Sequence, residues 1–126
     1  MGSFVFRTVL VFAIFTLCAG ITLPAQDTVP VDRVQAAVYG LHSAQQAHHI
    51  DVILNGLQGV LLSRTDLHSR NLFLFVRSDS PVSATQVQQL LKPMGVRIGC
   101  WTRAPRTDEP FHPVDADHCA ELEIHK

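Results

Sequence analysis

The strongest constraint on the fold is the order in which two hydrophobic periods alternate between Val31 and Thr102. A period of two predicts strands, and a run that is apolar on both faces predicts a central strand. A spacing of three and four residues predicts amphipathic helices over Ala44–Leu57 and Ser83–Met94. The predicted strands are Val31–Tyr39, Val60–Asp66, Asn71–Arg77 and Val96–Thr102.

Both predicted helices begin with a capping box. Ser43 with Gln46, and Ser83 with Gln86, fit the pattern in which each side chain satisfies a backbone N–H of the first turn. Gly59 and Gly95 follow the two helices, where glycine commonly ends a helix. These signals favour the helix boundaries that the hydrophobic spacing gives.

The order of elements is β-α-β-β-α-β, an α+β, ferredoxin-like arrangement. Right-handed crossovers place both helices on one face of a four-stranded antiparallel sheet, with the first and third strands in the centre. In the last strand, Val96, Ile98 and Cys100 are expected to face the same side. Residues 104–126 contain three prolines and no clear period, so we expect an irregular C-terminal extension.

The N-terminal segment has the pattern of a secretory signal peptide. An apolar run, Thr8–Leu23, follows Arg7 and is too short to span a bilayer comfortably. We expect residues 1–25 to be cleaved after Ala25, with Gly20 as the second candidate position. The protein would then be periplasmic or secreted and meet the membrane only during export. An uncleaved membrane anchor and a buried core helix are the alternatives.

After cleavage two of the three cysteines remain, Cys100 and Cys119. An even pair of thiols in an exported chain predicts a disulfide. The alternatives are two thiols that never meet and thiolate ligation of a metal. The expected organisation is a signal peptide over residues 1–25, one domain over residues 26–103 and an extension over residues 104–126.

Charge is divided unevenly along the chain. Residues 26–107 carry eight Lys/Arg and five Asp/Glu, a balance of +3, whereas residues 108–126 carry six acids and one Lys, a balance of −5. The basic excess is too small and scattered to indicate nucleic-acid binding. Phe73, Phe75 and Trp101 could form a ring-stacking face for RNA, but core packing is the favoured interpretation for an exported protein.

Several signatures along residues 31–102 resemble the heavy-metal-associated domain of copper chaperones and metal-transporting ATPases. That family has a Gly-Met-x-Cys-x-x-Cys loop after the first strand, a Gly-Val after the first helix and a Gly before the last strand. The matching residues here are Gly40-Leu41, Gly59-Val60 and Gly95. The two cysteine positions are held by Ser43 and Gln46, so the chain resembles a degenerate member without the CxxC pair.

Neither Ser43 nor Gln46 replaces a thiolate for a soft ion, since a hydroxyl stays protonated and an amide is neutral. Histidines and tail carboxylates are the remaining candidate ligands, for Cu(II), Zn(II) or Ni(II). They are His42 in the loop and, in the extension, His112, Asp115, Asp117 and His118.

Two functions follow from this sequence. The favoured one is an exported, non-catalytic module that acts through contacts with an unknown protein partner, in envelope metal handling. The alternative is a carrier or buffer of a transition-metal ion. No cofactor is required by the first, no catalytic constellation supports an enzyme, and the oligomeric state is left open.

Overall fold

The computed structural model of the 126-residue chain describes Gly20 and residues 29–124. Apart from Gly20, the predicted signal peptide lies outside these residues. Within residues 29–124, every helix falls short of the length and apolar character that a bilayer crossing requires.

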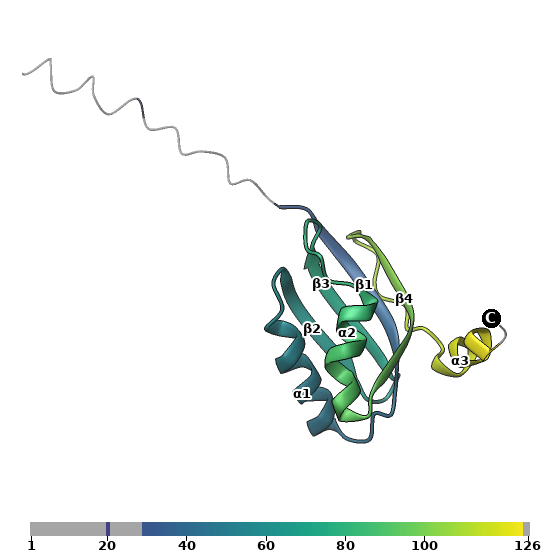
Figure 1. Ribbon diagram of the computed structural model, residues 1–126. Helices are drawn as coiled ribbons and strands as arrows, with labels where there is room; N and C mark the ends of the chain where they lie inside the picture. The colour runs from purple at the N-terminus through teal and green to yellow at the C-terminus, as the bar shows by residue number, and fades with distance from the viewer. Residues whose placement is uncertain (1–19, 21–28, 125–126) are drawn as a thin grey trace, which may run out of the picture.

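The ferredoxin-like order predicted from the sequence is confirmed (Figure 1). Four antiparallel strands form one sheet in the order β2-β3-β1-β4, so the first and third strands are central. The elements are β1 Val31–Tyr39, α1 Ala44–Asn55, β2 Val60–Asp66, β3 Asn71–Arg77, α2 Ala84–Leu91, a 3-10 turn η1 Lys92–Met94, β4 Arg97–Pro105 and α3 Ala116–Ile124.

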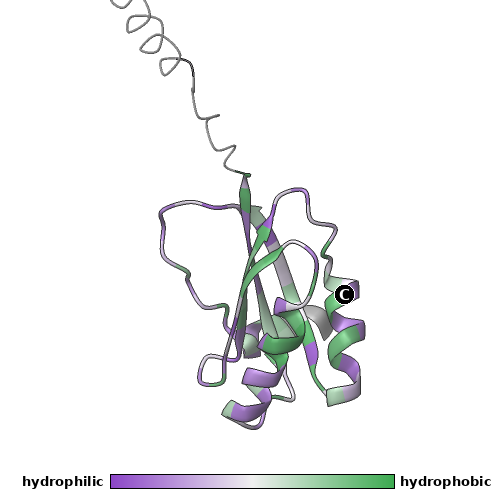
Figure 2. Ribbon diagram, turned by 90° about the vertical axis from the view of Figure 1, so that its left-hand side faces the viewer, coloured by the Kyte–Doolittle hydropathy of each residue, from purple (hydrophilic) through white to green (hydrophobic). Residues whose placement is uncertain are grey.

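The main core lies between the sheet and helices α1 and α2, which cover one face (Figure 1). Val34 of β1, Leu74 of β3 and Ile50 and Leu54 of α1 are fully buried there. In Figure 2 the helices carry both hydrophilic and hydrophobic residues, whereas stretches of the strands are hydrophobic. We call the face covered by α1 and α2 the helix face, and the opposite one the outer face.

The helices also cap the backbone of both edge strands. Asn55 Oδ1 accepts from the Ser63 N–H at 3.0 Å and Asp51 Oδ2 from the Thr65 N–H at 3.1 Å, both in β2. On β4, Gln88 of α2 accepts from the Ile98 N–H at 2.8 Å. Unpaired edge groups invite pairing with another chain. These contacts therefore leave the edges less open to an added strand than a bare four-stranded sheet would be.

A β-bulge in β4 changes the side to which Cys100 points. The pairing with β1 shifts between Gln35 and Ala37, and Cys100 has a positive φ of 50°. Ile98 and Trp101 contact the helix-face core, whereas Cys100 packs with Ala37 on the outer face. The prediction that Cys100 faces the same side as Ile98 is wrong, because the bulge inserts an extra residue into the alternation.

The C-terminal extension crosses the outer face of the sheet. Residues 106–115 are irregular, as expected, but Ala116–Ile124 form α3, which the sequence pattern did not indicate. Asn71, at the start of β3 and fully buried, exchanges two hydrogen bonds with the backbone of Val114, at 2.8 and 2.9 Å. The Tyr39 hydroxyl donates to the Ala116 carbonyl at 2.8 Å. We call residues 106–124 the strap.

Arg103 joins the N-terminal end of β1 to the turn before α2. Its guanidinium pairs with Asp32 at 2.8 Å and donates to the carbonyls of Ser80 and Val82. The hydrogen bonds from Arg103 and from the Ser78 hydroxyl hold the pKa of the Asp32 carboxyl below its ordinary value of 3.8. Asp32 therefore favours the folded state whenever it is ionised.

This pairing predicts an acid-dependent loss of stability. A carboxyl whose pKa is lower in the folded state contributes stability that is present above its unfolded pKa and is lost as pH falls through the folded pKa. The urea midpoint should therefore be steady near neutral pH and fall below about pH 4, and Asp32→Asn should reduce that fall. Asp79→Asn, which removes the exposed partner of Arg77, is the control. Equal pH profiles for the two variants would contradict the assignment.

Candidate functional site

The loop that follows β1 corresponds in position to the metal-binding loop of the heavy-metal-associated domains that the sequence resembles. Gly40 has a φ of 84°, and a Cβ there would lie 2.4 Å from the Gly95 carbonyl oxygen. A side chain at residue 40 would therefore both strain the backbone and collide with the turn before β4. This close approach gives a physical reason for Gly40, and it fixes the loop beside the end of η1.

The side chain of Gln46 ties this loop together. Its Oε1 accepts from the His42 N–H at 2.7 Å, and its Nε2 donates to the Gly40 carbonyl at 3.3 Å. A third, longer contact joins Nε2 to the Met94 carbonyl at 3.5 Å. Ser43 caps α1, as predicted, by accepting from the Gln46 N–H at 3.1 Å. The reciprocal bond of the capping box reaches His42 rather than Ser43.

A shallow hollow of about 370 Å³ lies outside this loop. It is lined by Ser43, Gln45, Gln46, His49 and Met94. The lining includes one imidazole and one thioether and carries no carboxylate or thiolate. His42, the loop ligand proposed from the sequence, is exposed and is not among the lining residues.

Two of the candidate ligands of the extension, Asp115 and Asp117, use their carboxylates to hold the strap. Asp115 caps α3, because its Oδ1 accepts from the Asp117 N–H at 3.0 Å and the His118 N–H at 3.3 Å. Asp117 pairs with Arg70 at 3.0 Å. His112 contributes its backbone carbonyl, which accepts from the side-chain amide of Gln35. Across the part of the chain that the structure describes, no three His, Cys, Asp or Glu side chains converge as a metal site would require.

The predicted disulfide between Cys100 and Cys119 is present, with a Cα–Cα distance of 5.9 Å. It joins the bulge of β4 to α3, and Cys119 is almost fully buried against Ala37 and Ala116. Both sulfurs lie on the outer face. The bridge therefore fastens the strap and contributes nothing to the loop at Gly40.

Sequence reasoning missed the residues that organise the strap and the edges. Asp51 and Gln88 look like ordinary polar helix positions, and their partners are known only once the helices are docked. Asn71 could have been recognised as unusual, because it is a polar residue directly before the apolar run Leu72–Val76. Phe111 stands alone in a proline-rich segment, where no periodicity assigns it a face.

The fold and the loop define the protein's class as a small α+β domain with ferredoxin-like topology. No protein-family model and no curated protein matches the chain. Among solved structures it is similar to the N-terminal domain of a potential copper-translocating P-type ATPase from Bacillus subtilis in its Cu(I)-loaded state. The two are 13% identical with a TM-score of 0.51, over 65% of this chain and 98% of that domain.

A second similar structure is the CopZ metallochaperone, at 18% identity and a TM-score of 0.47, over 52% of this chain and 97% of the metallochaperone. At these identities the likeness to the ATPase domain establishes the fold alone. It supports the heavy-metal-associated-like fold expected from the sequence.

Proposed function

We propose that the protein is an exported, non-catalytic module of heavy-metal-associated type that lacks a metal site in its loop and acts through protein contacts in envelope metal handling. Export rests on the N-terminal sequence pattern. The observation that carries the proposal is the position of Gln46, whose amide joins the backbone of His42 and Gly40. The side chain of Gln46, in the first turn of α1, therefore occupies the backbone groups of the loop.

The chemistry of the available donors supports the same conclusion. A soft ion such as Cu(I) is held by thiolates, and the loop offers a serine hydroxyl and a glutamine amide. Cys100 and Cys119 are joined to each other, and Cys18, the third cysteine, lies in the predicted signal peptide. The mature chain would therefore present no free thiolate to a metal.

The likeness in fold to a domain of a potential copper-translocating ATPase supports a place in metal handling. With no metal to carry, such a module would act by binding a protein. The non-catalytic assignment rests on the loop itself, where the Ser43 hydroxyl caps the helix and forms no hydrogen bond to an imidazole among the described residues.

A metal titration tests the proposal. The purified protein is titrated with Cu(I), Cu(II) and Zn(II) and followed by calorimetry and native mass spectrometry. We expect no stoichiometric ion at micromolar concentration. The double variant Ser43→Cys/Gln46→Cys should gain one Cu(I), because the fold then presents two thiolates at a helix N-terminus, where the dipole favours them.

Stoichiometric binding by the unmodified protein would overturn the proposal in favour of a metal carrier. In that case His42→Ala tests the loop and the double variant His112→Ala/His118→Ala tests the strap. The variant that abolishes binding then identifies the site. His68→Ala, in the β2–β3 turn, serves as the matched control for loss of a single imidazole.

A further inference from the structure

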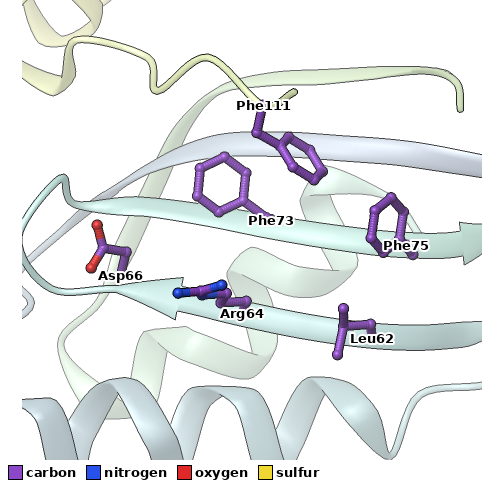
Figure 3. A pocket seen from close by; sticks show the side chains of 6 residues that line it. All are labelled: Leu62, Arg64, Asp66, Phe73, Phe75 and Phe111. Atoms are coloured by element: carbon purple, nitrogen blue, oxygen red, sulfur yellow. The ribbon is translucent and has the colours of Figure 1, made fainter. Parts of the chain in front are cut away.

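The outer face carries a groove that the metal-handling fold does not account for (Figure 3). Its volume is about 410 Å³, within the range typical of small-molecule sites. Six side chains line it, namely Leu62, Arg64, Asp66, Phe73, Phe75 and Phe111. Five of them come from β2 and β3, and Phe111 comes from the strap, so the docked strap completes the groove.

Three phenylalanine rings form the apolar part of the groove. Phe111 of the strap lies over the sheet with its ring centroid 4.5 Å from that of Phe73 and 5.5 Å from that of Phe75. All three residues are only partly buried. Leu62, on the neighbouring strand, is 48% exposed and extends this apolar surface. A flat or chain-like apolar body would find contact on several sides here.

The charges around the rings are mostly positive. The Arg33 guanidinium stacks on Phe111 at 3.9 Å from the ring centroid, and that of Arg106 stacks on Phe75 at 4.8 Å. Arg64 lies in the groove itself and has no hydrogen-bond or ion-pair partner among the residues that the structure describes. Among the lining residues Arg64 is the one cation and Asp66 the one carboxylate, and Arg33 and Arg106 add two guanidinium groups against the rings.

Asp66 does not neutralise Arg64 because its carboxylate is turned to the β2–β3 hairpin. There its Oδ2 accepts from the Ser69 N–H at 3.1 Å. The Arg64 guanidinium is therefore left as an unused five-donor group beside an apolar surface, an arrangement that suits the planar carboxylate of a bound molecule.

We propose that this groove binds a small amphiphilic carboxylate, with its apolar or aromatic body on Phe73, Phe75 and Phe111 and its carboxylate on Arg64. Such a ligand matches both the apolar lining and the positive charge of the site. Pairing of a partner's strand with the neighbouring edge strand β2 is a weaker explanation, because side chains of α1 already accept hydrogen bonds from the backbone of β2. The proposal goes beyond the proposed function and does not depend on whether a metal binds.

A matched pair of probes separates the contribution of the carboxylate from that of the apolar body. 1-Naphthaleneacetate carries a negative charge, and 1-naphthaleneacetamide has the same ring without it. Binding to the intact protein is measured by calorimetry and by ¹H–¹⁵N NMR. We expect the acid to bind about tenfold more tightly than the amide, since a hydrogen bond to a charged group is the difference between them.

Variants of two arginines locate the interaction. Arg64→Gln should weaken binding of the acid about tenfold and leave the amide unchanged. Arg77→Gln removes the same charge at an exposed site paired with Asp79 and should leave both probes unchanged. On addition of the acid, the changes in backbone ¹H–¹⁵N chemical shift should centre on residues 62–66, 73–75 and 111. Residues 40–46 should show no change.

Three results would overturn the proposal. The first is no binding of the acid at millimolar concentration, and the second is equal weakening of the acid by both arginine variants. The third is tighter binding of the peptide acetyl-Glu-Trp-Glu-amide than of the free acid, which would assign the groove to a protein partner. Arg64 is exposed and makes no contact that folding requires, so the variant should remain folded.

Discussion

Removing the disulfide by replacing Cys100 and Cys119 together with alanine is expected to lower the free energy of unfolding by about 3 kcal/mol. The bridge joins two residues that are 19 positions apart in the sequence, and it fastens α3 to the bulge of β4. Its loss allows the unfolded chain more conformations and frees the strap from the outer face. Urea unfolding followed by the fluorescence of Trp101 measures the change.

Hydrogen exchange locates the effect. Residues 106–124 should lose protection in the double variant, whereas α1 and β3, which belong to the main core, should keep most of theirs. The corresponding serine variant separates the covalent effect from burial, since Cys119 is only 1% exposed and a hydroxyl there would be desolvated. A loss below about 0.5 kcal/mol with a fully protected strap would show that side-chain contacts alone hold it.

Asp51→Ala is expected to lower the free energy of unfolding by about 2–4 kcal/mol and to promote association. The Asp51 carboxylate accepts from the Ser63 hydroxyl at 2.7 Å and from the Thr65 hydroxyl at 2.8 Å, besides the Thr65 N–H. Ser63 and Thr65 are only 6% and 9% exposed, so their donors would be left buried without an acceptor. Chemical denaturation measures the loss.

The same substitution removes the acceptor of the Thr65 N–H on an edge strand that already exposes Leu61 and Leu62, at 55% and 48%. Light scattering should therefore show concentration-dependent association of the variant. Asp51→Asn, which keeps one carbonyl oxygen, should be milder. The triple variant Asp51→Ala/Ser63→Ala/Thr65→Val should recover part of the stability, because it removes the unsatisfied hydroxyls. A triple variant no more stable than Asp51→Ala would contradict this assignment.

Local signals in the sequence were sufficient for most of the element boundaries. The hairpin strands Val60–Asp66 and Asn71–Arg77 have the predicted limits, and α1 and α2 begin after the predicted caps Ser43 and Ser83. These features depend on residues within a few positions of each other. The last strand shows the limit of that reasoning, since it runs over Arg97–Pro105 and contains a bulge that no periodicity indicated.

The candidate sites likewise have some features that can be read from the sequence and others that depend on tertiary contacts. The absence of cysteines at positions 43 and 46 is visible in the sequence, but the closure of the loop by Gln46 depends on where Gly40 and Met94 lie. The groove could not be anticipated, because Phe111 reaches Phe73 only when the extension crosses the sheet.

By itself the sequence determined the order of strands and helices and the helix caps, because hydrophobic period and capping chemistry depend on residues close together in the chain. It also favoured the pairing of Cys100 with Cys119, because these are the two cysteines outside the predicted signal peptide. The tertiary structure alone decided the path of the strap, the direction of Cys100 and the composition of the groove. Those features depend on contacts between distant residues, such as Tyr39 with Ala116 at a separation of 77 and Asn71 with Val114 at 43. Such contacts form only after the sheet has brought its strands together, and no local pattern encodes them.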